Sequence, residues 1–297
     1  MPNASDSIYL VDNSWQLYGP GATISYSFLA SLPTDYGSSV VLTDSKVIPY
    51  TYSGAYLTGF SPFTSDQRKA VSVIFHLIES LTTLRFVESP SSQAADIRFG
   101  NTIQPATGGV NVRDNFRPDR PTNINDVLIA TSTADTRLGG YGFATLIHEI
   151  CHALGLKHPS GGDAPPPLTG NLTTQDTVMA YKRPMVGSDP NADANGTTPL
   201  LLDVKALQGV YGSNPSANYG DSDYIFRDQP ASGPDDLLTR DIFIGQRRAI
   251  WDTGGVDTLN ASAVSTGSLL SLAEGSYSTV GPVRLGVAIA FRQRRHA

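Results

Sequence analysis

One stretch in the middle of the chain organises the rest: His148-Glu149-Ile150-Cys151-His152-Ala153-Leu154-Gly155-Leu156-Lys157-His158. His148 and His152 are four residues apart, so a helix places both imidazoles on one face, a single turn apart. Two imidazoles at that spacing can reach one tetrahedral metal ion at roughly 2.0–2.1 Å. Gly155 can adopt the left-handed conformation that closes a helix, which lets the chain turn back and bring His158 to the same ion.

Three neutral histidines leave a fourth metal position for water, which is the layout of a catalytic zinc site rather than a structural one. Glu149, next to the first histidine, is placed to accept a proton from that water. Cys151 is interpreted as a small packing residue, because the histidines already fill the site. As the one cysteine of the chain it can form no intramolecular disulfide. The alternative is a buried helix with hydrogen-bonded histidines and a surface glutamate.

The motif resembles that of the metzincin metalloproteases, and Pro159, directly after the third histidine, is similar to the serralysin branch. A second resemblance lies downstream, where Thr177-Val178-Met179-Ala180-Tyr181 is similar to the family's Met-turn. In serralysins the methionine of this turn lies under the metal, and the tyrosine is a further zinc ligand that moves to stabilise the oxyanion. The resemblance therefore implies a structural role for Met179 and a catalytic, zinc-binding role for Tyr181. Without the upstream motif, both residues would be interpreted as core residues.

The composition is that of a globular protein rich in turns, with 40% hydrophobic residues, 16% charged residues, 28 glycines and 20 prolines in 297 residues. It favours loops and sheet over a helical bundle. The formal net charge is −6 and the basic residues cluster only at the C-terminal end, so we expect no nucleic-acid partner. No run approaches the about 18 apolar residues of a transmembrane helix, so we expect no membrane partner. Residues 1–6 lack the basic and apolar regions of a Sec signal peptide.

The order of the predicted elements resembles a metzincin catalytic domain, which we assign to residues 1–212. Polar and apolar residues alternate over 23–30, which predicts a strand. The segment 64–81 begins with capping-box spacing and has apolar residues every three or four positions, which predicts a helix. The stretch 31–62 is predicted as loop with at most one short strand. The remaining predicted elements are strands at 84–87, 96–100, 109–113 and 127–130, the metal-binding helix at 143–154 and a closing helix at 200–212.

The resemblance implies an α+β fold with a twisted five-stranded sheet, the zinc helix and a loop-rich lower lobe. The edge strand of the sheet is antiparallel and aligns with residues 109–113. Its unpaired N–H and C=O groups would hold an extended peptide as an additional strand. Residues 159–198 form the lower lobe, which is shorter between His158 and Met179 than in the family. His76 lies off the apolar stripe of its helix, so we expect it on the surface.

Residues 213–297 are predicted to form a truncated all-β segment. Two pieces, 218–222 and 251–259, resemble the entry to the calcium-binding β-roll of serralysins, although Asn218 stands where the family has arginine. The resemblance implies one calcium ion, held by carboxylates and other oxygens. The implied ligands are Gly220, Ser222, Asp252, Gly254, Gly255 and Asp257. The alternative is an Asp/Gly hairpin turn that binds no ion.

The glycine-rich nonapeptide repeats that should follow are missing from the sequence. A β-solenoid needs about three repeats to bury its stack. We therefore expect a truncated or frameshifted relative that has lost most of the β-roll and the C-terminal type I export signal. A lineage that never had the repeats is the alternative. The family is exported without a Sec signal, which implies an extracellular location.

The sequence thus predicts a monomeric zinc-dependent endopeptidase, with one catalytic zinc, that acts on extended protein or peptide substrates. Two other classes stay open. The first is a catalytically impaired relative that binds zinc or calcium, and hydrolysis of an unfolded protein that a chelator abolishes would separate it from a peptidase. The second is a calcium-dependent binding module with a vestigial cleft, which predicts ligand binding that is insensitive to Glu149→Ala.

Overall fold

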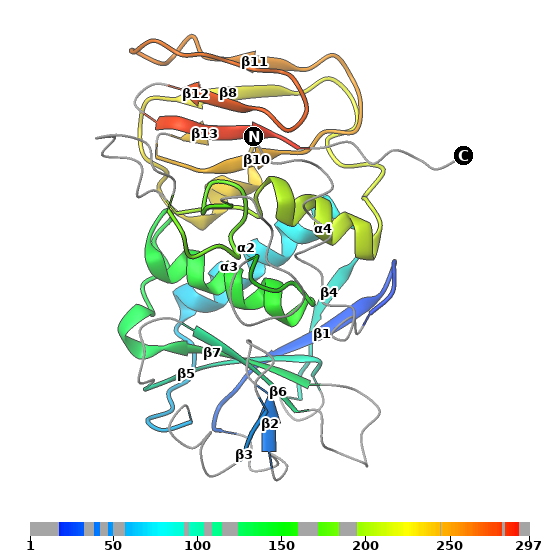
Figure 1. The fold of residues 1–297 in the computed structure, drawn as a ribbon, viewed down its shortest axis with the longest axis vertical. Helices are drawn as coiled ribbons and strands as arrows, with labels where there is room; N and C mark the ends of the chain where they lie inside the picture. The colour runs from blue at the N-terminus through cyan, green and yellow to red at the C-terminus, as the bar shows by residue number, and fades with distance from the viewer. Residues whose placement is uncertain are drawn as a thin grey trace.

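A computed structural model describes the chain over residues 18–32, 39–41, 47–49, 57–91, 95–103, 109–114, 124–159, 172–183, 195–243, 245–280 and 283–290. The predictions for residues 1–6, for much of the lower lobe and for the basic C-terminal end lie outside these ranges. Three layers follow one another along the long axis in Figure 1. A β-sheet lies at one end, helices occupy the middle, and a stack of short strands lies at the other end.

The large sheet contains seven strands: β1 Thr23–Phe28, β2 Ser39–Val41, β3 Val47–Pro49, β4 Arg85–Glu88, β5 Ile97–Thr102, β6 Gly109–Asp114 and β7 Ile124–Ala130. Their order is β3-β2-β6-β7-β5-β1-β4. β1, β4, β5 and β7 are parallel, and β6 is antiparallel to β7. The register places Arg98 opposite Asp126, and the two side chains form a buried two-armed ion pair at 2.5 and 2.7 Å. Removing either partner alone would leave an uncompensated charge in the core, so either single substitution should strongly destabilise the sheet.

The prediction of a five-stranded sheet with an antiparallel edge strand at 109–113 is wrong in two respects. The sheet has seven strands, and the antiparallel strand at these residues is not at its edge. β6 is antiparallel as expected, but it lies inside the sheet, because β2 pairs with it at Val41 and Arg113. β2 and β3 form an antiparallel hairpin beyond it. Each of these two strands is three residues long, which is too short for alternation of polar and apolar residues to distinguish a strand from a loop.

Helix α2 (Ser65–Leu81) begins at the predicted capping box. Gln67 N donates to Thr64 Oγ1 at 3.2 Å and Thr64 N donates to Gln67 Oε1 at 2.9 Å, so both arms of the box are formed. The apolar stripe of α2 is buried in the main core, which includes side chains from β1, β5 and β7. His76 is exposed, and its Nδ1 lies 2.7 Å from Ser72 O. The predictions of this helix and of a surface histidine are confirmed.

Two further helices complete the middle layer: α3 Tyr141–Ala153 and α4 Leu201–Tyr211, while a short 3₁₀ turn, η3 Thr131–Thr133, follows β7. α3 begins two residues before its predicted start, because Gly140 in an extended conformation takes the N-cap position. The ends of α3 and α4 are joined by the Tyr211 hydroxyl, which donates to Leu154 O at 2.6 Å. None of the helices in the described part of the chain has the length and apolarity needed to cross a membrane.

The C-terminal segment consists of short strands and one 3₁₀ helix in its described residues: β8 Asp223–Arg227, η4 Pro234–Leu238, β9 Ile242–Phe243, β10 Arg248–Ile250, β11 Thr258–Asn260, β12 Tyr277–Val280 and β13 Val283–Ile289. They form two three-stranded sheets, β11-β8-β9 and β10-β13-β12. All pairs are parallel except β12 with β13. Figure 1 shows these strands stacked next to α4. The predicted β-type segment is therefore present.

An apolar interface joins this segment to the helical layer. Leu201 and Val204 of α4 form a buried cluster with Ala249, Trp251 and Ala288. Burying such side chains together contributes about 25 cal/mol per Å² of apolar surface removed from water. The segment is thus packed on the helices, and the division at residue 212 stays a prediction.

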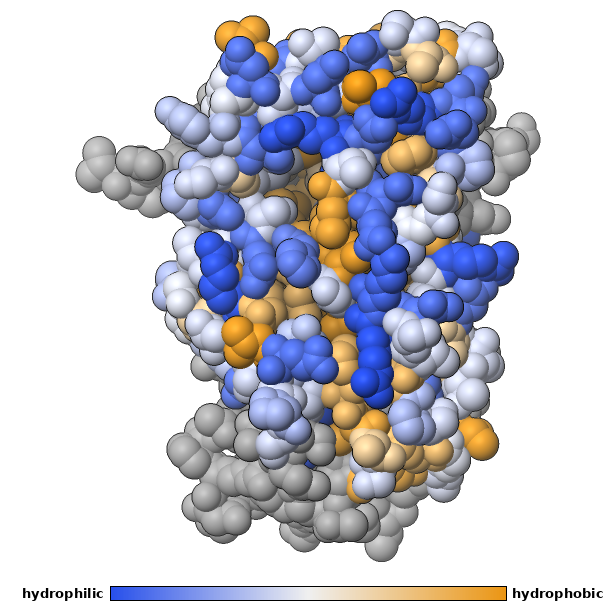
Figure 2. All heavy atoms as spheres, turned by 180° about the vertical axis from the view of Figure 1, so that it is seen from behind, coloured by the Kyte–Doolittle hydropathy of each residue, from blue (hydrophilic) through white to orange (hydrophobic). Residues whose placement is uncertain are grey.

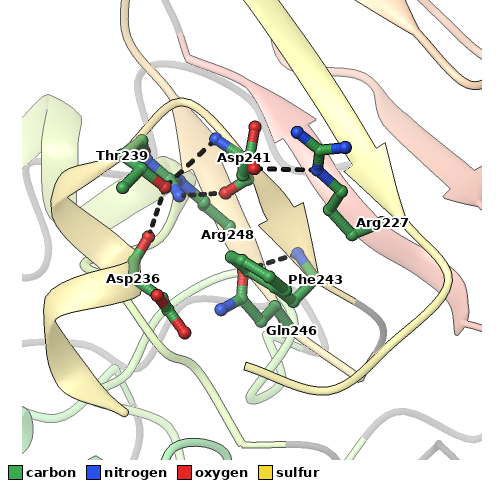
Figure 3. A network of polar contacts seen from close by, with 7 residues as sticks. All are labelled: Arg227, Asp236, Thr239, Asp241, Phe243, Gln246 and Arg248. Carbon is green, nitrogen blue, oxygen red and sulfur yellow. Dashed lines mark hydrogen bonds and ion pairs between the residues drawn. The ribbon is translucent and has the colours of Figure 1, made fainter. Parts of the chain in front are cut away.

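A polar network fixes the loop that leads into β10 (Figure 3). Arg227 Nε donates to Asp241 Oδ2 at 2.8 Å. Arg248 donates to Asp241 O at 3.1 Å and to Thr239 O at 2.9 Å. Burial lowers the pKa of Arg248 to about 10, which still leaves it charged at neutral pH. Gln246 Oε1 accepts from Phe243 N at 3.2 Å. The turn before β10 is therefore stabilised by this bond and by the bonds of Arg248.

The surface of the face opposite to that in Figure 1 is mixed in character (Figure 2). Hydrophilic residues border a band of apolar residues that runs along the long axis of the molecule. Apolar atoms make up much of the surface of any folded protein, so this band by itself identifies no partner.

Candidate metal centre

The C-terminal end of α3 turns back through Gly155. Gly155 has φ +86°, and its N–H donates to His152 O at 2.9 Å. Leu156 N donates to Cys151 O at 3.0 Å. This pair of hydrogen bonds is a Schellman motif with glycine at the left-handed position. The turn that the sequence predicts at Gly155 is therefore formed, and it carries the chain toward His158.

The turn brings the three histidines of the motif to one point. The Nε2 atoms of His148 and His152 are 3.0 Å apart, those of His152 and His158 are 3.0 Å apart, and those of His148 and His158 are 3.1 Å apart. All three residues are buried. In the described part of the chain, they are the one group of three or more His, Cys, Asp or Glu residues whose ligand atoms lie within 4.8 Å of one another.

Backbone carbonyls orient two of the rings. His148 Nδ1 lies 2.8 Å from Val178 O, and His152 Nδ1 lies 2.7 Å from Leu156 O. A carbonyl oxygen only accepts, so each Nδ1 carries the hydrogen and each Nε2 keeps its lone pair. Carbonyl partners of this kind fix the tautomer and the ring direction of metal-binding histidines.

Burial keeps the imidazoles neutral. It lowers the pKa of His148 to about 4 and, together with the neighbouring His148, lowers the pKa of His158 to about 3. The pKa of His152 is lowered by burial and by the two other histidines. Neutral imidazole is the form that binds metals, so the group needs no proton loss to accept an ion near pH 7.

These observations fit a zinc ion and do not suit an empty polar cluster. Lone pairs on neutral nitrogens about 3 Å apart repel one another unless a cation lies between them. Three nitrogen ligands with room for a further one match the preference of catalytic zinc. Cys151 is not part of the group: it is fully buried in the core, and burial raises the pKa of its thiol.

Glu149 lies beside this cluster on the wall of a cleft. The residue is buried, and it lines the same cleft as His148, Thr145 and Tyr141 of α3. The rest of the lining comes from the chain after the histidine motif and includes Val178, Ala180, Tyr181, Arg183, Asn195 and Gly196. A substrate in this cleft would meet the histidine cluster and the Glu149 carboxylate together.

Two residues of the predicted Met-turn, Val178 and Tyr181, contact the histidines. The Tyr181 hydroxyl is 2.7 Å from His158 Nε2, although its side chain is largely exposed. Met179 is fully buried in the main core, which also contains residues of α3. Val178, one position earlier, supplies the carbonyl that accepts from His148. The structure thus gathers His148, His152, His158, Glu149 and Tyr181 in one place, and their catalytic roles stay predictions.

Two carboxylates that sequence reasoning missed hold this turn. Asp203 in the first turn of α4 accepts from the Thr177 hydroxyl and from Val178 N at 2.8 Å. Asp176 accepts from the Tyr277 hydroxyl of β12 at 2.6 Å. The position of Asp203 near a helix start was a usable signal, because acidic residues are frequent there. No local pattern indicates the contact of Asp176, since its partner lies far away in the sequence.

The glycines predicted to bind calcium lie in two turns packed backbone against backbone. Gly220 N donates to Gly254 O at 2.9 Å. Gly255 has φ +116°, and a Cβ at this position would lie 2.3 Å from Gly220 O. Only glycine fits such a close approach.

The other predicted calcium ligands surround the same turns. Ser222 N donates to Asp257 Oδ1 at 3.1 Å. Asp252 accepts from Gly254 N at 3.0 Å and from the Tyr224 hydroxyl at 2.6 Å. Both carboxylates therefore lie beside the turns, where they already accept hydrogen bonds from the protein. Calcium binding stays a prediction.

Comparisons with known proteins agree with the geometry. Residues 239–293 match the family described as Peptidase M10 serralysin C terminal. Serralysin from Photorhabdus luminescens is 29% identical over 279 residues, which is 90% of this chain and 54% of the relative. Serralysin from Proteus mirabilis is 35% identical over 160 residues, or 52% of this chain and 32% of the relative. Metallopeptidase AprA from Pseudomonas marginalis is 25% identical and covers 97% of this chain and 67% of the relative. The chain is thus similar to the serralysins over most of its length.

The chain spans only part of the length of these relatives. It spans between 54% and 59% of the length of three Photorhabdus serralysins. Among solved structures it is similar to high choriolytic enzyme 1, a hatching enzyme zinc-protease from Oryzias latipes, with 13% identity, a TM-score of 0.31 and coverage of 66% of this chain and 94% of that one. That structural likeness is too low to support an inference.

Proposed function

We propose that this chain is a zinc-dependent endopeptidase. The observation that carries the proposal is the convergence of three neutral Nε2 atoms, 3.0–3.1 Å apart, on a cleft that Glu149 also lines. Similarity to the serralysins supports the same activity. Zinc, when bound there, would polarise the scissile carbonyl and lower the pKa of a bound water to about 7.

The residues of the chain have distinct tasks in this proposal. His148, His152 and His158 hold the ion, and the carbonyls behind the first two keep their rings in place. Glu149 accepts the proton of the attacking water and passes it to the leaving amine. The Tyr181 hydroxyl, now 2.7 Å from His158 Nε2, donates a hydrogen bond to the oxyanion of the substrate.

We propose protein or peptide chains as substrates. The cleft beside Glu149 extends along α3 toward Tyr141, with Thr145 and Val178 on its walls. Tyr141 lies seven residues before His148, a distance of about 10 Å along a helix. That length accommodates a substrate side chain next to the bond to be cleaved. We further propose a monomeric, extracellular enzyme with no nucleic-acid or membrane partner, in two units, 1–212 and 213–297.

The test compares the wild type with Glu149→Gln, which keeps the shape of the side chain and removes the base. We expect one zinc per chain in both proteins, and hydrolysis of an unfolded protein in the wild type only. The variant should lose about 10²- to 10⁴-fold in rate, the usual contribution of a general base. A chelator should abolish wild-type hydrolysis and zinc should restore it.

The competing function, a zinc-binding relative without peptidase activity, predicts a different result. Both proteins would hold zinc and neither would hydrolyse the substrate. Full activity in Glu149→Gln would instead remove Glu149 from its proposed role while leaving the metal site in place.

We also propose one calcium ion at the turns of the C-terminal segment, because Asp252 and Asp257 lie beside the Gly220 and Gly254 backbone. Carboxylates and carbonyl oxygens are the ligands that Ca²⁺ prefers. Calcium should raise the thermal midpoint of the wild type but not that of Asp257→Asn. Equal midpoints with and without calcium in the wild type would support the ion-free hairpin turn.

A further inference from the structure

The segment 176–181 makes two of the contacts that place the histidine cluster. Val178 O accepts from His148 Nδ1 at 2.8 Å, and the Tyr181 hydroxyl lies 2.7 Å from His158 Nε2. A shift of this segment would therefore displace the carbonyl that orients the His148 ring and the hydroxyl that contacts the His158 ring. Its own anchors decide how well the cluster is held.

One anchor comes from the helical layer. The Asp203 carboxylate accepts from Val178 N at 2.8 Å and from Leu200 N at 2.9 Å, and it also accepts from the Thr177 hydroxyl. Asp203 is fully buried, and hydrogen bonds to a buried carboxylate are among the stronger ones in proteins. This anchor joins the middle of the segment to the start of α4.

The second anchor comes from the C-terminal segment. The Tyr277 hydroxyl donates to Asp176 Oδ1 at 2.6 Å, although the two residues are 101 positions apart in the sequence. Asp176 Oδ2 accepts from Thr173 N at 2.8 Å and from its hydroxyl at 3.0 Å. Burial, together with the charge of Asp176, raises the pKa of Tyr277, so its hydroxyl stays a donor.

The sheet that contains Tyr277, β10-β13-β12, also contacts a second segment of the cleft lining, around Gly196. Arg247 O accepts from Thr197 N at 2.9 Å and from its hydroxyl at 2.9 Å. Ala249 N donates to the Thr198 hydroxyl at 3.2 Å. Gly196, which lines the cleft, forms a β-bridge with Arg247. The polar network in Figure 3 fixes the loop from which this strand starts.

From these contacts we propose that Tyr277 is a positioning residue of the histidine centre, which it reaches through Asp176 and the segment 176–181. The C-terminal β segment is then part of the frame of the cleft and not an appendage to it. The inference rests on the proposed zinc site. It concerns how tightly the site holds its ion, so it can be tested separately from hydrolysis.

The test measures the zinc affinity of Tyr277→Phe. Phenylalanine preserves the ring and removes the hydroxyl. Loss of a direct partner of a metal-binding histidine weakens metal affinity about 10- to 100-fold. Tyr277 acts through Asp176 and not on a histidine directly, so its effect should be smaller. We expect the zinc affinity of Tyr277→Phe, measured in competition with a chelator, to be roughly threefold to tenfold lower than that of the wild type.

Ser278→Ala is the matched control. Ser278 is the next residue on β12 and is buried, and its hydroxyl accepts from Ser271 N at 3.0 Å. Successive residues of a strand point to opposite faces, so this change perturbs the same strand without touching Asp176. We expect wild-type zinc affinity in this variant. Amide exchange of Val178 and Met179 in the zinc-free protein should accelerate in Tyr277→Phe and not in Ser278→Ala.

A double-mutant cycle with Asp176→Asn tests the route. If Tyr277 acts through Asp176, the two changes share one interaction, and the double variant should be less impaired than the product of the single effects. Unchanged zinc affinity in Tyr277→Phe, equal weakening in Ser278→Ala, or independent effects in the cycle would overturn the inference. A wild type that binds zinc but hydrolyses nothing would refute the proposed activity and leave this inference standing.

Discussion

Replacing Asp203 by alanine should destabilise the zinc-free protein, whereas Asp203→Asn should change its stability little. The carboxylate accepts hydrogen bonds from Thr177, Val178 and Leu200 and is fully buried. Alanine leaves three buried donors without an acceptor, and each such donor costs about 1–3 kcal/mol. The midpoint of that range gives a cost of about 6 kcal/mol.

Removing the charge offsets part of this cost. Burial raises the pKa of Asp203 to about 6, from an ordinary value of 3.8. The folded carboxyl therefore holds its proton more tightly than the unfolded one, and its ionised form at pH 7 costs about 3 kcal/mol. The net effect of alanine is then a loss of about 3 kcal/mol. Asparagine also removes the charge, and its amide oxygen can still accept from Val178 and Leu200, so we expect a change within about 1 kcal/mol.

Urea unfolding at pH 7 in the presence of a chelator measures both variants without a contribution from bound zinc. The alanine variant should unfold at a clearly lower urea concentration than the wild type, with an unchanged slope. Asp203→Asn serves as the control for the loss of charge. The reasoning is refuted if alanine changes the free energy of unfolding by less than about 1 kcal/mol, or if asparagine is as damaging as alanine.

Three further changes test other parts of the centre. Tyr181→Phe should lower turnover about tenfold or more with full zinc content, and an unchanged rate would exclude the hydroxyl from catalysis. Gly155 has φ +86°, so Gly155→Ala should lower the free energy of unfolding in urea by about 1–2 kcal/mol. Gly209 lies inside α4 with open space around it, so Gly209→Ala should raise that free energy by about 0.5–1 kcal/mol. Equal effects of the two substitutions would contradict the assigned conformations. The zinc-free protein should lose stability in urea as the pH falls from about 6.5 toward 4, because the pKa of His148 is about 4 when folded and about 6.5 when unfolded. Asp203, whose pKa is raised in the folded state, contributes in the opposite direction over this range. It is one group against three histidines with lowered pKa values, so the net stability should still fall. A rise in stability on acidification would contradict the buried, neutral cluster.

The elements that carry the centre were predictable because their signals are local. The spacing of His148, His152 and His158 around Gly155 gives both the helix and the turn that ends it. α2 was equally accessible, since its capping box and apolar stripe lie within one segment of the chain. In each of these cases, the residues that decide the structure are neighbours in the sequence.

Features that depend on distant partners escaped sequence reasoning. Nothing near Tyr277 indicates that its hydroxyl binds Asp176, 101 residues away. The strands β2 and β3 are too short to show a period, so the sheet was expected to be narrower than it is. In both cases tertiary contacts, and not local preference, decide the outcome.

Asn218 shows how a departure from a family pattern can be accommodated. It stands where the family has arginine, and in the structure it adopts φ +51°, a conformation that asparagine tolerates better than most residues. Its side-chain amide donates to Trp251 O at 2.9 Å. This bond adds to those of Gly220 and Ser222 between the two calcium-candidate turns, and the sequence alone did not predict it.

The central claim is that three histidines hold one zinc ion with a side open toward Glu149. Anomalous diffraction at the zinc absorption edge, from crystals of the zinc-loaded chain, tests it most directly. The account predicts one peak at roughly 2.0–2.1 Å from the Nε2 atoms of His148, His152 and His158, with Tyr181 as the one further protein ligand allowed. A peak elsewhere, rings that point apart, or an ion enclosed by other protein groups with no access for water would contradict it.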